Sequence, residues 1–382
     1  MKLKRTIAAL LCAGVLMAGM TACTKSDIRE YDPPAESAEV TNPPVETETE
    51  DTGYAYAYEK YAPDTLVLTI NGLPVYWSEF FYWISGNVSQ IESYFGPIED
   101  WNAEWMMDAS LTNAQYILQS TEDPLKQYRS LESNIMALDI KLDDDDEQRL
   151  IEEWDGYVMS YAEGDEEVFI NEYLTPIFLT KEIYMNMLRI ESFYEVGFEA
   201  IYGDKGENFS DEDVEIYLED SGTLRAKHIL ISTVDDAGED LSEEEIAEKT
   251  ALAEDILAQL EAADDLDAKF DELMNEHTED PGVVNYPDGY VFGSGEMVPE
   301  FEDGTKALEV GTISGLVKSS YGYHIIMRLS LDAETTTDNG FTLREVAAMA
   351  EYDVLITSWK DEATLVWEPE FENLDFAALF AR

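Results

Sequence analysis

Cysteine, histidine and basic side chains are all scarce in this chain of 382 residues. It has 2 Cys, 3 His and 23 Lys+Arg against 83 Asp+Glu, which gives a formal net charge of −60. Because nucleic-acid backbones are held by clustered Lys and Arg, this balance excludes sequence-independent nucleic-acid binding, and it disfavours attraction to anionic lipid surfaces. Hydrophobic residues still make up 45% and aromatic residues 12% of the chain. There is therefore enough apolar material for folded cores, and the length predicts roughly two or three domains.

The first 22 residues have the pattern of a signal peptide. A basic start precedes an apolar run over residues 7–20, which is too short to span a bilayer. Small residues then precede Cys23, and this ending resembles a bacterial lipobox. The resemblance implies that residues 1–22 are removed, that Cys23 receives fatty-acyl chains such as palmitate, and that the protein is anchored to the cell membrane outside the cytoplasm. An ordinary signal peptide with an incidental Cys23 is the alternative.

The two cysteines also limit the chemistry. Cleavage would remove Cys12 and lipidation would use Cys23, so the mature chain would hold no disulfide, no thiol nucleophile and no cysteine metal site. Any activity must then depend on histidine, carboxylates, hydroxyls or shape.

Residues 23–63 are rich in Thr, Glu, Pro and Asp and have almost no aliphatic side chains. This composition predicts a disordered, self-repelling linker. Four tyrosines close the segment. Either they pack on the domain that follows or they form an exposed aromatic patch, and the sequence leaves both interpretations open. These tyrosines are Tyr54, Tyr56, Tyr58 and Tyr61.

A helical N-terminal domain is expected over residues 64–221. It opens with Asn71-Gly72 between two apolar runs, which is a strong hairpin signal. Ser78 is expected to cap the helix that follows. The acidic run at residues 143–146 suggests a calcium loop, but it lacks the glycine and the terminal Glu spacing of an EF-hand. We interpret it as the start of a helix, where negative charge is favoured.

The second half of the chain begins with short strands and a helix that Ser242 opens with a capping box. A polar break at residues 332–340 precedes a last helix at about residues 343–359. We expect the segment 331–382 to return to the N-terminal domain, because its apolar side chains need burial that a lone tail cannot provide. These side chains are Trp359, Trp367, Phe371 and Leu374.

Four short motifs follow one another in this half. They are RAKHIL at 225–230, GEMVPEF at 295–301, VGTISG at 310–315 and YGYHII at 321–326. Their order and spacing resemble the parvulin family of peptidyl-prolyl isomerases over about residues 222–330. The resemblance implies an α+β fold, in which a four-stranded antiparallel sheet with covering helices is inserted in a mainly helical, chaperone-like domain. With the candidate lipobox, the layout is also similar to extracytoplasmic foldase lipoproteins of the PrsA type.

The reaction of that family, rotation about an X-Pro bond, needs few chemical groups from the protein. Rotation about a peptide bond faces a barrier of ~18–20 kcal/mol, because resonance must be broken. Uncatalysed X-Pro exchange takes roughly tens to hundreds of seconds. An isomerase needs an apolar pocket for the proline ring and a polar cluster that favours the twisted amide. Since no bond is cleaved, no metal and no cofactor are expected.

The resemblance also assigns the polar residues of the site. His228 and His324 match the paired histidines of the parvulin centre. Asp280 matches the third polar member, which is a Cys or an Asp in the family. Ser319 stands where the family often has Thr, and we expect it to donate a hydrogen bond to the cluster. His277 stands where the family usually has an aromatic residue, and a surface or packing role is expected for it.

Apolar residues of the family's proline pocket can be placed in the same way. Met297 and Phe301 match the pocket wall, and Phe292 is a further member. Taken alone, each of these would be interpreted as plain core packing. Gly289 stands where the family has a leucine that lines the pocket. The pocket is therefore expected to be wider, or partly refilled by Tyr290.

Charge selects the subfamily. Positions 229–248 contain eight acidic residues and no Lys or Arg. Phosphate would be repelled there, so a phospho-specific isomerase is excluded. The features together predict a peptidyl-prolyl cis-trans isomerase and chaperone for newly secreted polypeptides with X-Pro bonds. The alternative is a non-catalytic holdase whose parvulin module is a degenerate clamp. A third reading, an acidic lipoprotein that binds solutes or cations, has no supporting motif.

Overall fold

The computed structural model describes residues 53–235, 237–337 and 339–381. They divide into two compact units, one made of the residues up to 197 together with those from 354 on, and the other of residues 198–353. Among the described residues, no helix combines the length and the apolar character needed to cross a membrane.

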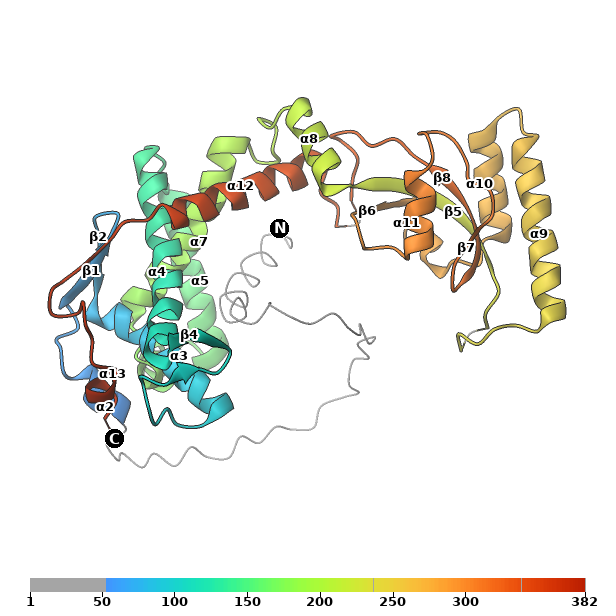
Figure 1. Cartoon of the computed structure of the whole chain (residues 1–382). Helices are drawn as coiled ribbons and strands as arrows, with labels where there is room; N and C mark the ends of the chain where they lie inside the picture. Colours follow the sequence, from blue (N-terminus) through green and yellow to red (C-terminus); the bar gives the residue numbers. More distant parts are fainter. Residues whose placement is uncertain (1–52, 236, 338, 382) are drawn as a thin grey trace. The chain divides into compact units, whose positions relative to one another are not determined.

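The first unit is organised on a three-stranded sheet of order β2-β1-β9 (Figure 1). The predicted hairpin is confirmed, because β1 and β2 pair in antiparallel fashion around Asn71 and Gly72, whose φ angles are 51° and 82°. Strand β9 pairs with the other edge of β1, with Leu68 opposite Trp367. The strands are β1 (Leu66–Ile70), β2 (Leu73–Tyr76) and β9 (Leu365–Trp367).

Rings from both ends of the chain build the core of this unit. Trp77 stacks on Phe371 with ring centroids 5.9 Å apart, and Phe81 stacks on Phe380 at 6.2 Å. Helix α2 (Gly53–Tyr58) contributes Tyr58, which packs on the same core. The segment that the sequence assigned to the end of the linker is thus partly helical and packed.

The four tyrosines of that segment do not behave alike. Tyr54, Tyr58 and Tyr61 are partly buried against the core, whereas Tyr56 is 55% exposed. Packing on the folded unit is therefore the correct interpretation for three of them. The expected linker is wrong at its C-terminal end, because burial of these rings compensates the ordering of the chain.

The expected cap of helix α3 (Trp77–Phe95) is also wrong. The helix begins one residue before Ser78, with Tyr76 at the N-cap position and no side-chain cap. The side chain of Trp77 is fully buried, and its indole N–H donates to the carbonyl of Tyr58 at 2.8 Å. Burial of this ring, and not a hydroxyl cap, sets the start of the helix.

The rest of the unit is mostly helical. The acidic run at 143–146 starts a helix as predicted. The Asp143 side chain accepts from the Asp146 N–H, and the Asp146 side chain accepts from the Asp143 N–H. The remaining elements are β3 (Glu104–Trp105), β4 (Asp108–Thr112), α4 (Asn113–Ala137), α5 (Asp144–Ala162), α6 (Glu166–Phe169), the π-helix η1 (Ile170–Leu174), the 3₁₀ helix η2 (Thr175–Ile177), α7 (Lys181–Tyr202) and α13 (Phe376–Leu379).

The second unit contains the four-stranded antiparallel sheet that the fold class predicted, in the order β6-β5-β8-β7 (Figure 1). Its strands are β5 (Leu224–Ser232), β6 (Tyr290–Phe292), β7 (Val317–Lys318) and β8 (Gly322–Arg328). Its helices are α8 (Asp211–Ser221), α9 (Glu243–Glu261), α10 (Leu266–His277), the 3₁₀ helix η3 (Pro281–Val284), α11 (Pro299–Lys306) and the first part of α12 (Leu343–Asp361).

The two faces of this sheet bury different side chains, because successive residues of a strand point to opposite faces. Ile229 and Ile325 pack with α9 and α10. Ala226 and Ile326 lie on the other face with Phe301 of α11. The even-numbered residues of β5 and β8 therefore face α11.

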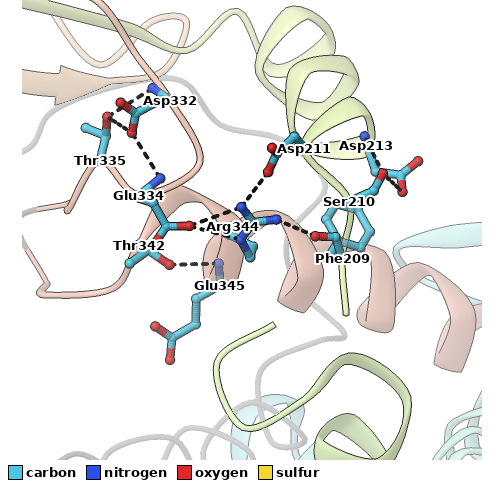
Figure 2. Close-up of polar contacts among 10 residues, drawn as sticks. All are labelled: Phe209, Ser210, Asp211, Asp213, Asp332, Glu334, Thr335, Thr342, Arg344 and Glu345. Carbon is cyan, nitrogen blue, oxygen red and sulfur yellow. Dashed lines mark hydrogen bonds and ion pairs between the residues drawn. The ribbon is translucent and has the colours of Figure 1, made fainter. Parts of the chain in front are cut away.

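In the second unit, Arg344 connects the start of α12 to the start of α8 (Figure 2). The Arg344 guanidinium, at the start of α12, donates to the carbonyl of Phe209 and to the carboxylates of Asp211 and Glu334. Glu334 lies in a turn held by Asp332, whose carboxylate accepts from the Glu334 N–H at 3.0 Å. The polar break expected at residues 332–340 is therefore tied to the start of α8.

Candidate active site

Two histidines meet on the face of the sheet that carries α11. His228 lies on β5 and His324 on β8, where Leu230 pairs with His324 and His228 with Ile326. Both imidazoles thus project from the same face, two positions apart in register. Their rings stack at 5.1 Å with an interplanar angle of 10°, and the two Nδ1 atoms are 2.9 Å apart.

Asp280 lies at the other side of His228. Its Oδ2 is 2.9 Å from His228 Nε2 and accepts from the Tyr290 hydroxyl at 2.6 Å, while Oδ1 accepts from the Gly282 N–H at 3.0 Å. Burial raises the pKa of Asp280, but the hydrogen bonds from His228, Tyr290 and Gly282 outweigh burial and lower that pKa to about 2. The carboxylate is therefore ionised at neutral pH.

Asp280 is held in place by the segment that precedes it. The Glu279 N–H donates to the carbonyl of Leu230 at 2.8 Å, and the Leu230 N–H donates to the Thr278 hydroxyl at 3.1 Å. The Ser232 N–H donates to the Glu279 carboxylate at 2.7 Å. Strand β6 pairs only with residues 224–226 of β5. Thr278 and Glu279 therefore bind the edge of β5 beyond these residues, at Leu230 and Ser232. The backbone of β5 thereby sets the distance between Asp280 and His228.

Ser319 completes the far end of the cluster. Its Oγ is 2.7 Å from His324 Nε2 and accepts from the Tyr321 N–H at 3.1 Å. His324 is only 3% exposed. Burial and, to a smaller extent, the neighbouring His228 lower the pKa of His324 to about 4, although Asp280 opposes the shift. His324 is thus neutral at pH 7.

These contacts fit a single direction of hydrogen bonding. Proton positions are assigned from the network, since an ionised carboxylate only accepts and a neutral imidazole carries one N–H. His228 Nε2–H then donates to Asp280, which leaves His228 Nδ1 to accept from His324 Nδ1–H. His324 Nε2 accepts from the Ser319 hydroxyl. With this assignment, each of the four imidazole nitrogens makes one hydrogen bond.

A pocket of about 1180 Å³ opens over this cluster. Met297 and Phe301 line it together with His228, Asp280 and His324. The Phe301 ring stands edge-on to His228, with centroids 5.0 Å apart at 79°. The structure thus brings all four predicted polar residues and two of the three predicted apolar residues to one place.

Phe292 is the exception among the apolar residues. It is 2% exposed, its ring lies 5.7 Å from that of Phe301, and it is not among the residues that line the pocket. It therefore lies behind Phe301 and supports that ring. The reason is register: Phe292 pairs with Leu224 at the end of β5 away from His228.

Tyr290 is a functional candidate that the sequence indicated only as a pocket filler. It lines the pocket, and its hydroxyl donates to Asp280. Space for that hydroxyl exists because residue 282 is glycine, where an added Cβ would lie 2.0 Å from the Tyr290 oxygen. The signal in the sequence was the pair formed by Gly282, two residues after Asp280, and a tyrosine next to Gly289.

His277 lies apart from the site, and Cys23 lies outside the described residues. His277 ends α10, and its Nε2 is 3.8 Å from the Glu276 carboxylate. Cys23 and the expected signal peptide fall outside the described residues. No group of three or more His, Cys, Asp or Glu is placed to hold a metal ion within the residues that the structure describes.

The pocket continues from the histidines along α9, and this part is acidic. Glu245, Glu248 and Lys249 of α9 line it together with Glu279 and Asp235. The ammonium group of Lys249 is paired with the Glu279 carboxylate. The field in this part of the pocket is therefore negative.

The residues of the site lie in a segment that is similar to a known family of domains. Residues 228–330 match the family model described as Rotamase: PPIC-type PPIASE domain. Foldase protein PrsA of Halalkalibacterium halodurans is 31% identical over 168 residues, which are 43% of this chain and 39% of that protein. Chaperone SurA of Thiobacillus denitrificans is 35% identical over 126 residues, or 31% of this chain and 26% of that protein. The chain thus spans well under half the length of these curated relatives.

The crystal structure of peptidylprolyl isomerase PrsA from Bacillus cereus aligns with 74% of this chain and 100% of that chain, at 21% identity and a TM-score of 0.31.

Proposed function

From the PPIC-type parvulin domain at residues 228–330, we infer that this protein is a peptidyl-prolyl cis-trans isomerase. One observation carries the proposal. A pocket with an apolar wall, formed by Met297 and Phe301, opens on a fixed chain of Asp280, His228 and His324. A proline ring fits the wall, and the amide that precedes it then lies over the polar chain.

The electrostatics of the pocket favour rotation. Resonance in the planar amide places negative charge on the carbonyl oxygen, and the twisted amide loses that charge. An ionised carboxylate in a partly dry pocket repels the planar form more than the twisted form, so Asp280 lowers the barrier. Tyr290 and His228 keep Asp280 ionised and fixed. The reaction needs no proton transfer.

The rest of the chain fits a membrane-tethered foldase. We propose that residues 1–22 are a lipoprotein signal peptide, that Cys23 is lipidated, and that the linker expected over residues 23–63 ends where the packed helix α2 begins, at Gly53. The parvulin domain, at residues 222–330, acts outside the cytoplasm. Of the helical domain predicted over residues 64–221 and 331–382, residues 64–197 and 354–382 belong to the first unit. We propose that this unit holds unfolded or newly secreted polypeptides, in keeping with the names of the relatives.

The clients are not phosphorylated at the residue before proline. The negative field of Glu245, Glu248 and Asp235 along the pocket repels phosphate and favours neutral or basic segments.

A protease-coupled proline-isomerisation assay tests the activity. We expect the wild-type protein to accelerate exchange in a neutral X-Pro peptide. Asp280→Asn should lose on the order of tenfold or more in kcat/KM, because the charge is removed while the shape is kept. His228→Ala and Tyr290→Phe should also lose activity, since each removes a hydrogen bond to Asp280.

His277→Ala is the matched control, since this histidine lies outside the pocket lining. It should keep wild-type activity. If the wild-type protein exchanges the peptide no faster than the uncatalysed background, the protein is a non-catalytic holdase and the isomerase proposal is wrong. Full activity in the Asp280, His228 and Tyr290 variants would show that the site lies elsewhere.

A further inference from the structure

A patch of large apolar side chains is exposed on the first unit, which does not contain the pocket. Tyr94 and Phe95, in the last turn of α3, are 66% and 49% exposed. Met106 and Met107, which connect β3 to β4, are 64% and 73% exposed. We call these four residues the hairpin patch.

The hairpin patch has a rigid base. The Phe95 ring meets the Trp105 ring edge-on at 5.7 Å, and Trp105 stacks on Tyr116 of α4 at 4.3 Å and 11°. Trp105 is only 7% exposed. The Asp108 carboxylate accepts from both the N–H and the hydroxyl of Ser110, at 2.9 and 2.7 Å. The two methionines are therefore presented on an ordered hairpin.

The chemistry of the turn points to binding. Two-residue hairpin turns usually carry Gly, Asn or Asp, which fit the backbone and are well solvated. Here Met106 and Met107 occupy both positions with most of their surface in water. Such side chains add little to the stability of this fold. Phe95 contacts Trp105, which directly precedes Met106, and large apolar side chains exposed around one such contact mark an interaction site.

We propose that the hairpin patch binds apolar segments of unfolded polypeptides that also carry Lys or Arg. The proposal rests on the proposed chaperone role and names its client surface. Methionine side chains are flexible and polarizable, so they adapt to many apolar sequences. The exposed carboxylates of Glu104 and Asp108 flank the methionines in β3 and β4.

Charge selects this occupant over two others. A second copy of the chain brings the same acidic surface, and the formal net charge of each copy is −60. Like charges would then face each other across the contact. An anionic lipid surface is repelled in the same way. A basic and apolar peptide meets both features of the patch.

Direct binding to the full chain tests the proposal with peptides that contain no proline, so that the isomerase pocket is not required. One fluorescent, unstructured peptide combines Leu, Phe and Lys, and its partner has Glu in place of each Lys. We expect the Lys peptide to bind about tenfold more tightly than the Glu peptide, measured by fluorescence anisotropy. The double variant Met106→Ser with Met107→Ser should weaken binding of the Lys peptide at least tenfold.

The matched control is Met136→Ser with Met159→Ser. These methionines are 56% and 63% exposed on the same unit but lie outside the hairpin patch. This variant should bind like the wild type. Thermal unfolding checks that both variants fold. Tyr94→Ser changes a different residue of the hairpin patch and should also weaken binding of the Lys peptide.

Several results would overturn the proposal. Equal binding by the wild type and the Met106/Met107 variant would remove the patch as the docking site. Equal binding of the two peptides would remove the preference for basic clients. A dimer that the double variant loses, seen by sedimentation, would assign the patch to a second copy. Flotation with vesicles of anionic phospholipid that the Met106/Met107 variant loses would assign it to a membrane. Isomerase failure with peptide binding intact would refute only the proposed enzyme.

Discussion

Burial acts on Asp280 and His324 in the same sense, since it favours the neutral form of each, yet only His324 becomes neutral. Asp280 accepts hydrogen bonds from His228, Tyr290 and Gly282, and these stabilise its charge. His324 faces another imidazole, so its proton would be both buried and repelled. The pair thus holds one fixed negative charge next to a neutral, oriented ring.

The pKa of His324 predicts a pH-dependent stability. It falls from 6.5 to about 4 on folding, so the unfolded chain binds a proton that the folded chain does not bind between these values. The stabilisation is fully present above pH 6.5 and is lost as the pH falls towards 4. Between pH 7 and pH 5 we expect the wild type to lose about 2 kcal/mol more of its unfolding free energy than His324→Gln, measured by urea denaturation.

His277→Gln is the matched control, because it makes the same substitution at a histidine outside the pocket lining. An identical pH dependence for His324→Gln and the wild type would show that His324 is not held neutral in the folded state.

For single residues, the sequence predicted which residues form the site. It predicted the roles of these residues only in part. His228, Asp280 and His324 were indicated by the parvulin motifs, but the direction of hydrogen bonding depends on which atoms meet. Tyr290 could not be assigned its hydrogen bond because Gly282, which makes room for it, lies eight positions away on a different element.

Among the elements, β6 depends on a backbone conformation that only glycine adopts without strain. Gly289, which precedes it, has φ +90°, and an added Cβ would lie 2.7 Å from the carbonyl oxygen of Ala226 on β5. Because that atom belongs to the backbone of the neighbouring strand, it cannot turn away. A side chain at residue 289 would push β6, and with it Tyr290, away from the site.

The prediction uses a second glycine as its control. Gly295 has φ +86° with nothing within 4 Å of an added Cβ. Gly295→Ala should therefore cost only about 1 kcal/mol, the strain of the left-handed conformation. Gly289→Ala should cost roughly 1–3 kcal/mol more and reduce isomerase activity. Urea unfolding followed by circular dichroism measures both. Equal costs would mean that β6 has no close contact with β5 at this point.

Local sequence signals predicted several elements well. The Asn71-Gly72 hairpin and the helix starts at Asp143 and Ser242 have the expected conformations, because each depends on residues a few positions apart. The start of α3 was wrong for the opposite reason. Trp77 is buried against residues from the other end of the chain, and this contact has no local signal.

For the whole molecule, the two units predict two separable transitions. Phe371 is 3% exposed and stacks on Trp77, so Phe371→Ala should destabilise the first unit by about 3–5 kcal/mol. Isomerase activity at 25 °C should remain, because the pocket is built within the second unit. Phe270 lies at a fully buried position of the α10 core in the second unit. Phe270→Ala should therefore destabilise the second unit and reduce isomerase activity, while the first unit keeps its stability. Calorimetry together with the isomerase assay measures both effects.

A joint loss of stability and activity in both variants would contradict this prediction. It would show that the two units unfold as one.

The sequence by itself determined the acidic character, the family motifs, the candidate site residues and the elements that short-range patterns specify. Those properties depend on composition or on neighbours along the chain. Only the tertiary structure decided that Asp280 reaches His228, that Tyr290 joins them, that Phe292 lies behind the pocket and that β9 completes the sheet of β1. These contacts join residues far apart in the chain, and they depend on how buried side chains fill a common space.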